Sequence, residues 1–161
     1  MSVKIISLEA FILAGYFGGV ELGMSKAAVV EILGEPIEEI DLDFSFSALL
    51  YGNIELHFYG DMHELVLIQN DWLDDFFDSD LYRLNAQNSI DVSFLRKIGI
   101  RNYSTIKAEF IQNNIPFLEK ERDGYDEIIL ESGVTLDFEN WKDEGVERTK
   151  SKLNGIRLFD F

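Results

Sequence analysis

The 161-residue sequence contains no cysteine, which excludes disulfide bonds, cysteine-ligated zinc sites and thiol nucleophiles. It has only two prolines, Pro36 and Pro116. No stretch reaches the ~18 uninterrupted apolar residues that a membrane-spanning helix needs. Residues 1–11 hold a single lysine, and Glu9 interrupts their apolar run, so we expect a mature amphipathic segment rather than a signal peptide. These absences predict a soluble, cytoplasmic chain with no membrane partner.

Basic residues are nearly missing from the first half of the chain. Residues 1–80 contain two basic and sixteen acidic side chains, whereas residues 81–161 contain twelve basic and fourteen acidic ones. Nearly all of the net charge of −16 therefore belongs to the first half. Such a field repels nucleic acid and anionic lipid, and it accelerates the encounter with a basic partner. The alternative is that the acids only keep a phenylalanine-rich protein in solution.

Motifs of catalysis and metal binding are also missing. The glycine-rich residues 15–19 follow no strand-like segment and precede no Gly-Lys-Ser/Thr, and no Gly-x-Ser-x-Gly occurs. His57 and His63 lie close to acidic residues, but their spacing matches no standard ligand motif. We therefore expect a protein that is not an enzyme and that uses neither a cofactor nor a metal.

The second half of the chain repeats features of the first. Pro36 and Pro116 lie 80 residues apart, each after a helix-like stretch, and the strand-like segments 53–58 and 133–138 have the same offset. A unit present only twice suggests two similar lobes that close on each other. We divide the chain into a first repeat at 1–70, an acidic aromatic linker at 71–92 and a second repeat at 93–161, all within one compact domain.

Hydrophobic periodicity and turn residues predict the same order of elements in each repeat. The expected helices span residues 7–17, 25–33, 93–97 and 104–113. The expected strands span residues 44–51, 54–59, 64–68, 125–131, 134–138 and 155–159. Ser7 and Ser25 are suited to cap the first two helices, and residues 139–152 form an enlarged loop. The predicted fold is α+β, a tandem duplication of an ααβββ unit with an antiparallel sheet and helices packed on one face.

Residues 22–36 read Leu-Gly-Met-Ser-Lys-Ala-Ala-Val-Val-Glu-Ile-Leu-Gly-Glu-Pro. This run resembles the opening of the ααβββ modules in the β-lactamase-inhibitor-protein and BamE-like group, where Gly-Met, a polar cap and Val precede Leu-Gly-x-Pro. The second repeat keeps only Gly99 and Pro116 of this pattern. The resemblance implies a joined sheet with a concave face that holds another protein. The inhibitor family is secreted and disulfide-bonded and the BamE-like proteins are usually lipoproteins, so their named activities are not carried over to this cysteine-free chain.

The best candidate for a binding surface is the stretch 71–82, which contains five aspartates and four aromatic residues in twelve positions. Tryptophan and tyrosine are preferred interface anchors, and carboxylates pair with the lysines and arginines of a partner. The alternative is an Asp-capped helix whose aromatic side chains pack inward while its acids are solvated. A second acidic run at 38–43 and the outward side chains of strand 54–59 extend this surface. The candidate residues are Trp72, Asp74, Asp75, Asp78, Asp80 and Tyr82 of the linker, Glu38, Glu39, Asp41 and Asp43 of the acidic run, and Glu55, His57 and Tyr59 of the strand.

These features lead to the hypothesis of a protein-binding module without catalytic activity. We expect its acidic surface to dock on a basic toxin or enzyme domain and block it, as a cytosolic immunity protein does. One alternative is an intracellular assembly or adaptor protein without a toxin partner. Another is a domain that binds a small ligand in the cleft between the lobes. The sequence leaves the identity of the partner and the oligomeric state open.

Overall fold

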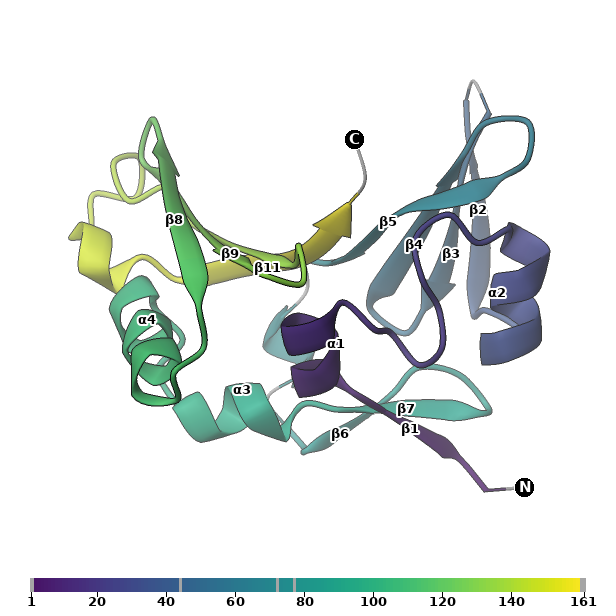
Figure 1. Ribbon diagram of the computed structural model, residues 1–161, viewed down its shortest axis with the longest axis horizontal. Helices are drawn as coiled ribbons and strands as arrows, with labels where there is room; N and C mark the ends of the chain where they lie inside the picture. The colour runs from purple at the N-terminus through teal and green to yellow at the C-terminus, as the bar shows by residue number, and fades with distance from the viewer. Residues whose placement is uncertain (1, 44, 72, 77, 160–161) are drawn as a thin grey trace.

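In the computed structural model of the chain, the described residues are 2–43, 45–71, 73–76 and 78–159, and of residues 75 and 76 only the backbone is described. They form an eight-stranded antiparallel sheet, a layer of helices on one of its faces and a separate three-stranded sheet (Figure 1). The expectation of a mixed helix and sheet fold with an antiparallel sheet is therefore confirmed. No helix of this described part is long and apolar enough to cross a membrane.

The helices begin where polar side chains cap them. α1 (Leu8–Ala14) begins after Ser7, whose hydroxyl accepts a hydrogen bond from the Ala10 N–H, and α2 (Lys26–Leu33) begins in the same way after Ser25. α3 spans Ser93–Ile98 and α4 spans Tyr103–Gln112. α1 ends three residues earlier than expected, because Gly15 adopts a left-handed conformation with φ of 69° and closes the helix before Gly18.

The eight-stranded sheet is assembled from four consecutive strands of each half. The strands are β2 (Glu38–Leu42), β3 (Phe46–Tyr51), β4 (Ile54–Tyr59), β5 (Glu64–Asn70), β8 (Phe117–Arg122), β9 (Tyr125–Leu130), β10 (Thr135–Phe138) and β11 (Leu153–Phe159). Their order is β2-β3-β4-β5-β11-β10-β9-β8, so the two halves meet where β5 pairs with β11. The predicted ααβββ unit is wrong by one strand in each half. The missed strands β2 and β8 are edge strands, and because most of their residues are exposed they show no hydrophobic alternation.

The pairing is interrupted by a register shift at matching places in the two halves. Between β4 and β5 the register shifts between His57 and Phe58, and between β10 and β11 it shifts between Asp137 and Phe138. A bulge of this kind bends a strand and increases its twist. In Figure 1 the sheet accordingly bends about its centre, so that β8 and β2 rise at opposite ends on the side away from the helices.

The three-stranded sheet was not expected from the sequence. It has the order β1-β7-β6, in which β1 (Lys4–Ser7) pairs in parallel with β7 (Asn88–Asp91), and β7 pairs with β6 (Leu81–Arg83). The predicted linker thus contains two strands and a short 3-10 helix, η1 (Leu73–Phe76). These strands are three or four residues long, and their pairing connects positions 84 residues apart, so no local pattern indicates it.

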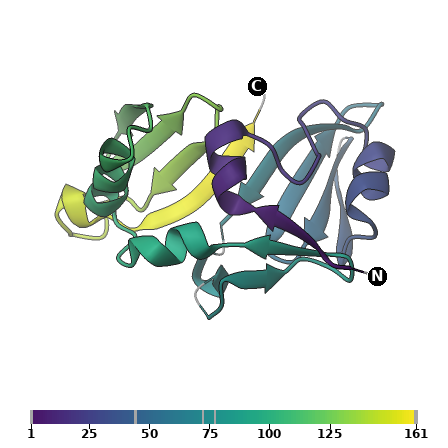
Figure 2. The same ribbon diagram turned by 60° about the horizontal axis from the view of Figure 1, so that its bottom comes forward.

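The core lies between the helices and the face of the large sheet that they cover (Figure 2). Phe58 and Phe138 are fully buried on this face, as are Val29 of α2 and Phe110 of α4 on the facing helices. The predicted enlarged loop 139–152 contains a 3-10 helix, η2 (Arg148–Lys150). The Arg148 guanidinium donates hydrogen bonds to both carboxylate oxygens of buried Asp126 in β9, which fixes this loop to the sheet.

Candidate functional site

The side of the large sheet that faces away from the helices, called the open face below, can be assigned residue by residue. Phe58 lies under Lys26 of α2, whose Nζ is 5.9 Å from the ring centroid, and Phe138 contacts the ring of Tyr103 in α4 at 5.3 Å. Both rings therefore point towards the helices. Because successive side chains of a strand alternate between faces, His57 and Asp137 point to the open face.

Three exposed apolar side chains lie together on the open face at its first-half end. Leu42 pairs with Phe46 across β2 and β3, and Phe46 pairs with Tyr59 across β3 and β4. The rings of Phe46 and Tyr59 are in contact, with 4.4 Å between their centroids. Leu42, Phe46 and Tyr59, called the apolar cluster, are 40%, 38% and 51% exposed. Exposed aromatic side chains that support one another are typical anchors of protein interfaces.

The apolar cluster is bordered by acidic residues of β2. Glu38 shares the open face with Ile40 and Leu42, because all three occupy alternate positions of the strand. Glu39 and Asp41 point to the other side, where Glu39 forms an ion pair of 2.6 Å with Lys26. The sheet edge next to the apolar cluster is therefore negatively charged on both of its sides.

A network of polar side chains occupies the centre of the open face, where β5 pairs with β11. The Gln69 side-chain amide donates a hydrogen bond of 2.9 Å to the Glu55 carboxylate, whose Oε2 is also 2.8 Å from His57 Nε2. Arg157 is the cross-strand partner of Gln69. Its guanidinium forms ion pairs with Asp71 at 3.1 Å and Asp137 at 3.3 Å. We call these six residues the seam network.

The surroundings of the two strand carboxylates shift their pKa values in opposite directions. Burial raises the pKa of Asp137, and the nearby Arg157 charge only partly opposes this effect. Burial also acts to raise the pKa of Glu55, but the hydrogen bonds with Gln69 and His57 outweigh it, so the pKa lies below its ordinary value. The network thus favours the ionised form of Glu55 and holds it, with the Arg157 guanidinium, in a fixed position at the centre of the open face.

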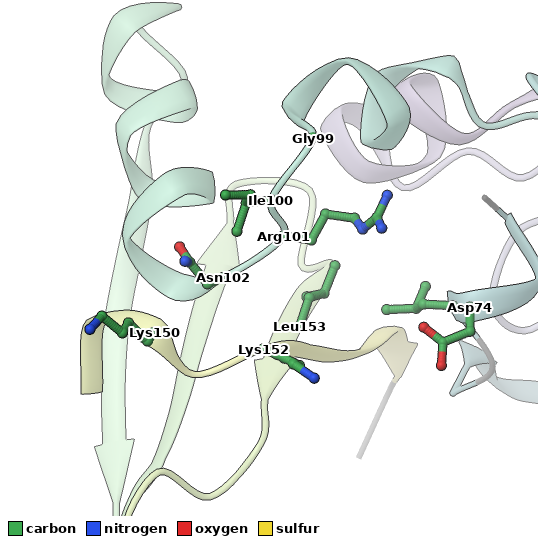
Figure 3. A pocket seen from close by; sticks show the side chains of 9 residues that line it. Asp74, Gly99, Ile100, Arg101, Asn102, Lys150, Lys152 and Leu153 are labelled. Carbon is green, nitrogen blue, oxygen red and sulfur yellow. The ribbon is translucent and has the colours of Figure 1, made fainter. Parts of the chain in front are cut away.

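A cavity of about 430 Å³ lies between η1 and the turn that joins α3 to α4 (Figure 3). It is lined by Leu73, Asp74, Gly99, Ile100, Arg101, Asn102, Lys150, Lys152 and Leu153. In Figure 3 the Arg101 side chain extends towards the side of the cavity formed by Asp74, whereas Lys150 points away. Burial lowers the pKa of Arg101, and the Asp74 charge opposes this shift.

The structure separates the candidate residues into two groups. Tyr59, with Glu38, Glu55 and His57, lies on the open face, and Glu39, Asp41 and Asp43 lie along the adjoining edge and the turn that follows it. The candidate residues of the linker do not join this group. Asp74 lines the cavity, Asp78 is exposed, Asp80 forms an ion pair with Arg96 of α3, and Tyr82 is half-buried in β6. Trp72 and the side chain of Asp75 fall outside the described residues.

The sequence did not predict several residues of the open face as part of a site. Leu42 and Phe46 were not considered exposed, and Asp137 and Arg157 were not connected with Glu55. The alternation of Arg157 with buried Ile156 and Leu158 is a signal that it points away from the core. Its position next to the first half depends on the pairing of β5 with β11, which no sequence pattern indicates.

The two histidines do not meet in the structure as a ligand set. His57 is held by Glu55, whereas His63 lies in a turn with a φ of 47°. Over the described residues, no group of three or more His, Asp or Glu side chains is arranged to hold a metal ion.

Comparison with known proteins identifies no family for this chain. No protein-family model and no curated protein matches it. One solved structure that matches is an extracellular protein containing an SCP domain from Bacillus anthracis, with 10% identity, coverage of 86% of this chain and 44% of that chain, and a TM-score of 0.36. Another is a cysteine-rich secretory protein from Staphylococcus aureus, with 11% identity, coverage of 98% and 50%, and a TM-score of 0.39. The chain spans half or less of these proteins, and similarity this low transfers no activity, ligand or partner.

The comparison overturns the family resemblance suggested by residues 22–36. The matching structures are SCP-domain proteins, and neither is a β-lactamase inhibitor protein or a BamE-like protein. The identification with that group is therefore wrong. The motif itself has a local explanation: Ser25 caps α2, and Gly34, with φ of 75°, ends it. A polar residue at the start and a glycine at the end are common at helix ends in general.

Proposed function

We propose that this protein binds a basic protein through the open face of its large sheet and covers a functional site of that partner, as an inhibitor or immunity protein does. The observation that carries the proposal is the exposed ring pair of Phe46 and Tyr59 on a face without helices, next to an acidic edge. Apolar anchors supply affinity, and acids around them select a basic partner. The linker acids Asp74, Asp78 and Asp80, which lie away from the open face, add to the long-range attraction without contacting the partner.

The seam network supports the proposal because hydrogen bonds and ion pairs fix its side chains before any partner binds. Ionised groups held by hydrogen bonds lose little side-chain entropy when a partner binds. Arg157 lies between Asp71 and Asp137, and Glu55 is held by Gln69 and His57, so their orientations are set in the free protein. A partner with complementary charges meets a fixed pattern at the centre of the open face.

We also infer that the two halves are copies of one unit, which would explain the width of the open face. Support comes from the register shifts after His57 and after Asp137, which lie 80 residues apart in β4 and β10, the strands next to β5 and β11 in the sheet. Leu56 and Leu136 then correspond, as do Phe58 and Phe138, and all four are buried. The polar sides have diverged, because His57 corresponds to Asp137 and Gln69 to Arg157.

The experiment is partner capture followed by quantitative binding. Tagged protein is exposed to lysate of its source organism at low and moderate salt, and a stoichiometric basic protein is identified and purified. Tyr59→Ser should weaken its binding by about tenfold or more, as expected for an interface anchor. Tyr16→Ser is the matched control, because Tyr16 is 50% exposed and Tyr59 is 51% exposed. Calorimetry with the purified partner measures both.

A second set of variants distinguishes residues that contact the partner from residues that only attract it by their charge. Replacing Asp74, Asp78 and Asp80 together by asparagine should slow association at low salt and leave the dissociation rate unchanged. If Tyr59→Ser and Tyr16→Ser have equal effects, or if only the linker variant abolishes binding, the open face is not the binding surface.

A further inference from the structure

The outermost strand of the first half has one backbone edge without a partner strand. β2 pairs with β3 in an unbroken register from Glu38↔Leu50 to Leu42↔Phe46, and it ends the order of the eight-stranded sheet. Within the residues described, no further strand pairs with β2. Alternate residues of an edge strand turn their N–H and C=O groups outward, where they are available to another strand.

Only acidic side chains protect the free edge of β2 from pairing with another strand. β2 contains no proline and its pairing shows no bulge, and its charged side chains, Glu38, Glu39 and Asp41, are all acidic. An acidic strand would be repelled by them, whereas a basic strand would form favourable cross-strand pairs. The opposite edge, β8, carries Lys120 and Arg122 together with two glutamates, so it favours neither sign.

The two sides of β2 present different side chains to an added strand. Glu39 and Asp41 lie on the helix side, and Ile40 and Leu42 lie on the open face, with Glu38 at its start. Side chains of a paired strand would lie next to these in the same alternation. The complementary segment therefore carries basic residues at alternate positions and apolar residues between them. Its apolar side chains would extend the apolar cluster.

We propose that β2 is a docking edge at which an extended, basic segment of the partner, with lysine or arginine alternating with apolar residues, adds a ninth strand. The inference rests on the proposed function and specifies how the partner is held. Main-chain hydrogen bonds to the edge supply affinity, and the alternation supplies specificity. Charge favours this occupant over the large sheet of a second copy, because the edges of that sheet are acidic at β2 and mixed at β8.

The test is a titration of isotope-labelled full-length protein with the peptide acetyl-Lys-Val-Lys-Val-Lys-Val-Lys-amide, followed by NMR. Amide shifts should change in β2 and β3 and remain unchanged in β8. A peptide with glutamate in place of lysine tests charge. A peptide with proline in place of two valines keeps the charge but cannot form the strand. Neither control peptide should shift β2.

Protein variants provide the matched control. Glu39→Gln with Asp41→Asn, which removes the two acids on the helix side of β2, should weaken peptide binding about two- to tenfold at low salt, in line with the modest strength of exposed charge pairs. Glu9→Gln with Glu31→Gln removes the same charge from exposed helix positions of the same half and should leave peptide binding unchanged. Equal weakening by both pairs would mean that only net charge matters, and it would overturn the proposal.

Other outcomes also decide the question. Shifts centred on β8, or equal shifts with all three peptides, would contradict docking at β2. Concentration-dependent shifts of β2 in the protein alone would assign the edge to a second copy. If the peptide binds β2 while Tyr59→Ser leaves partner capture intact, the proposed open face fails and the edge stands. If Tyr59→Ser abolishes capture while the peptide does not bind, only the docking edge fails.

Discussion

At the scale of single residues, the seam network combines two carboxylates with opposite behaviour. Asp137 is largely buried, with 17% of its side chain exposed, and its Oδ1 has no hydrogen-bond partner among the described residues, although Arg157 lies at ion-pair distance. Glu55 has its hydrogen-bonding partners in place. Burial without full hydrogen bonding favours the protonated form of an acid, whereas hydrogen bonds to the carboxylate favour the ionised form.

The first residue-scale prediction concerns Asp137→Asn. Because the folded-state pKa of Asp137 is raised above its ordinary value of 3.8, the folded protein binds this proton more tightly than the unfolded chain. Its contribution to stability is therefore complete below 3.8 and decreases as pH rises through the folded-state pKa. The free energy of unfolding of the wild type minus that of Asp137→Asn should fall as pH increases over this window. Urea unfolding from acid to neutral pH measures it.

The control for this prediction is Asp143→Asn, at an exposed position of the loop after β10. Its difference from the wild type gives the baseline at each pH. A difference for Asp137→Asn that rises with pH would show that Arg157 stabilises the ionised carboxylate more than burial destabilises it. That result would contradict the assigned direction of the shift.

At the scale of elements, local capping determines where the helices begin. The Ser25 hydroxyl accepts a hydrogen bond of 3.2 Å from the Ala28 N–H, which would otherwise have no partner in the first turn of α2. α2 carries Lys26, which pairs with Glu39 of the docking edge. The start of this helix therefore also affects the edge.

We predict that Ser25→Ala lowers stability by about 1 kcal/mol, because the cap is lost. The melting temperature should fall by about 2–4 °C for a chain of this length. Ser25→Asn restores a side-chain acceptor and should return stability to within a few tenths of a kcal/mol of the wild type. Scanning calorimetry on the three proteins is sufficient. Equal melting temperatures for the wild type and Ser25→Ala would mean that the cap contributes nothing.

Helices and strands that depend on interactions between neighbouring residues could be predicted from the sequence, whereas those that depend on distant residues could not. The hairpin of β3 and β4 around Gly52 and the alternation of buried Leu56 with outward His57 are local, and both predictions are confirmed. β2 and β8 were missed because neither has a buried face with regular alternation. Of the candidate site, the outward side of β4 was predictable, whereas Phe46 and Arg157 were not.

At the scale of the whole molecule, the pairing of β5 with β11 makes one sheet from the two halves. Ile68 of β5 and Ile156 of β11 are each 1% exposed and belong to one continuous core. The pairing of β1 with β7 joins the halves a second time, in the three-stranded sheet. Neither half can unfold without exposing the core of the other.

We therefore predict a single cooperative unfolding transition. Ile68→Ala and Ile156→Ala should each cost about 2–5 kcal/mol, because a cavity replaces the buried side chain. Hydrogen exchange should speed up in both halves for either variant. Ile111→Ala is the control, because Ile111 is 59% exposed on α4, and it should change stability by less than about 0.5 kcal/mol. Two separate transitions, or faster exchange limited to one half, would show that the halves are independent.

The sequence by itself determined the features that depend on neighbouring residues. It placed the acidic charge in the first half, the caps at Ser7 and Ser25, and the hairpin of β3 and β4. Caps, turns and alternation act within a few residues, so they can be read along the chain.

The tertiary structure alone decided which strands meet. Gln69 and Arg157 lie 88 positions apart in the sequence and become cross-strand partners only because the whole core is buried when β5 and β11 pair. The same assembly leaves β2 at one edge and exposes Phe46 and Tyr59 on the face without helices. Choice of a distant partner depends on the total apolar surface that all elements bury together, and no short segment carries that information.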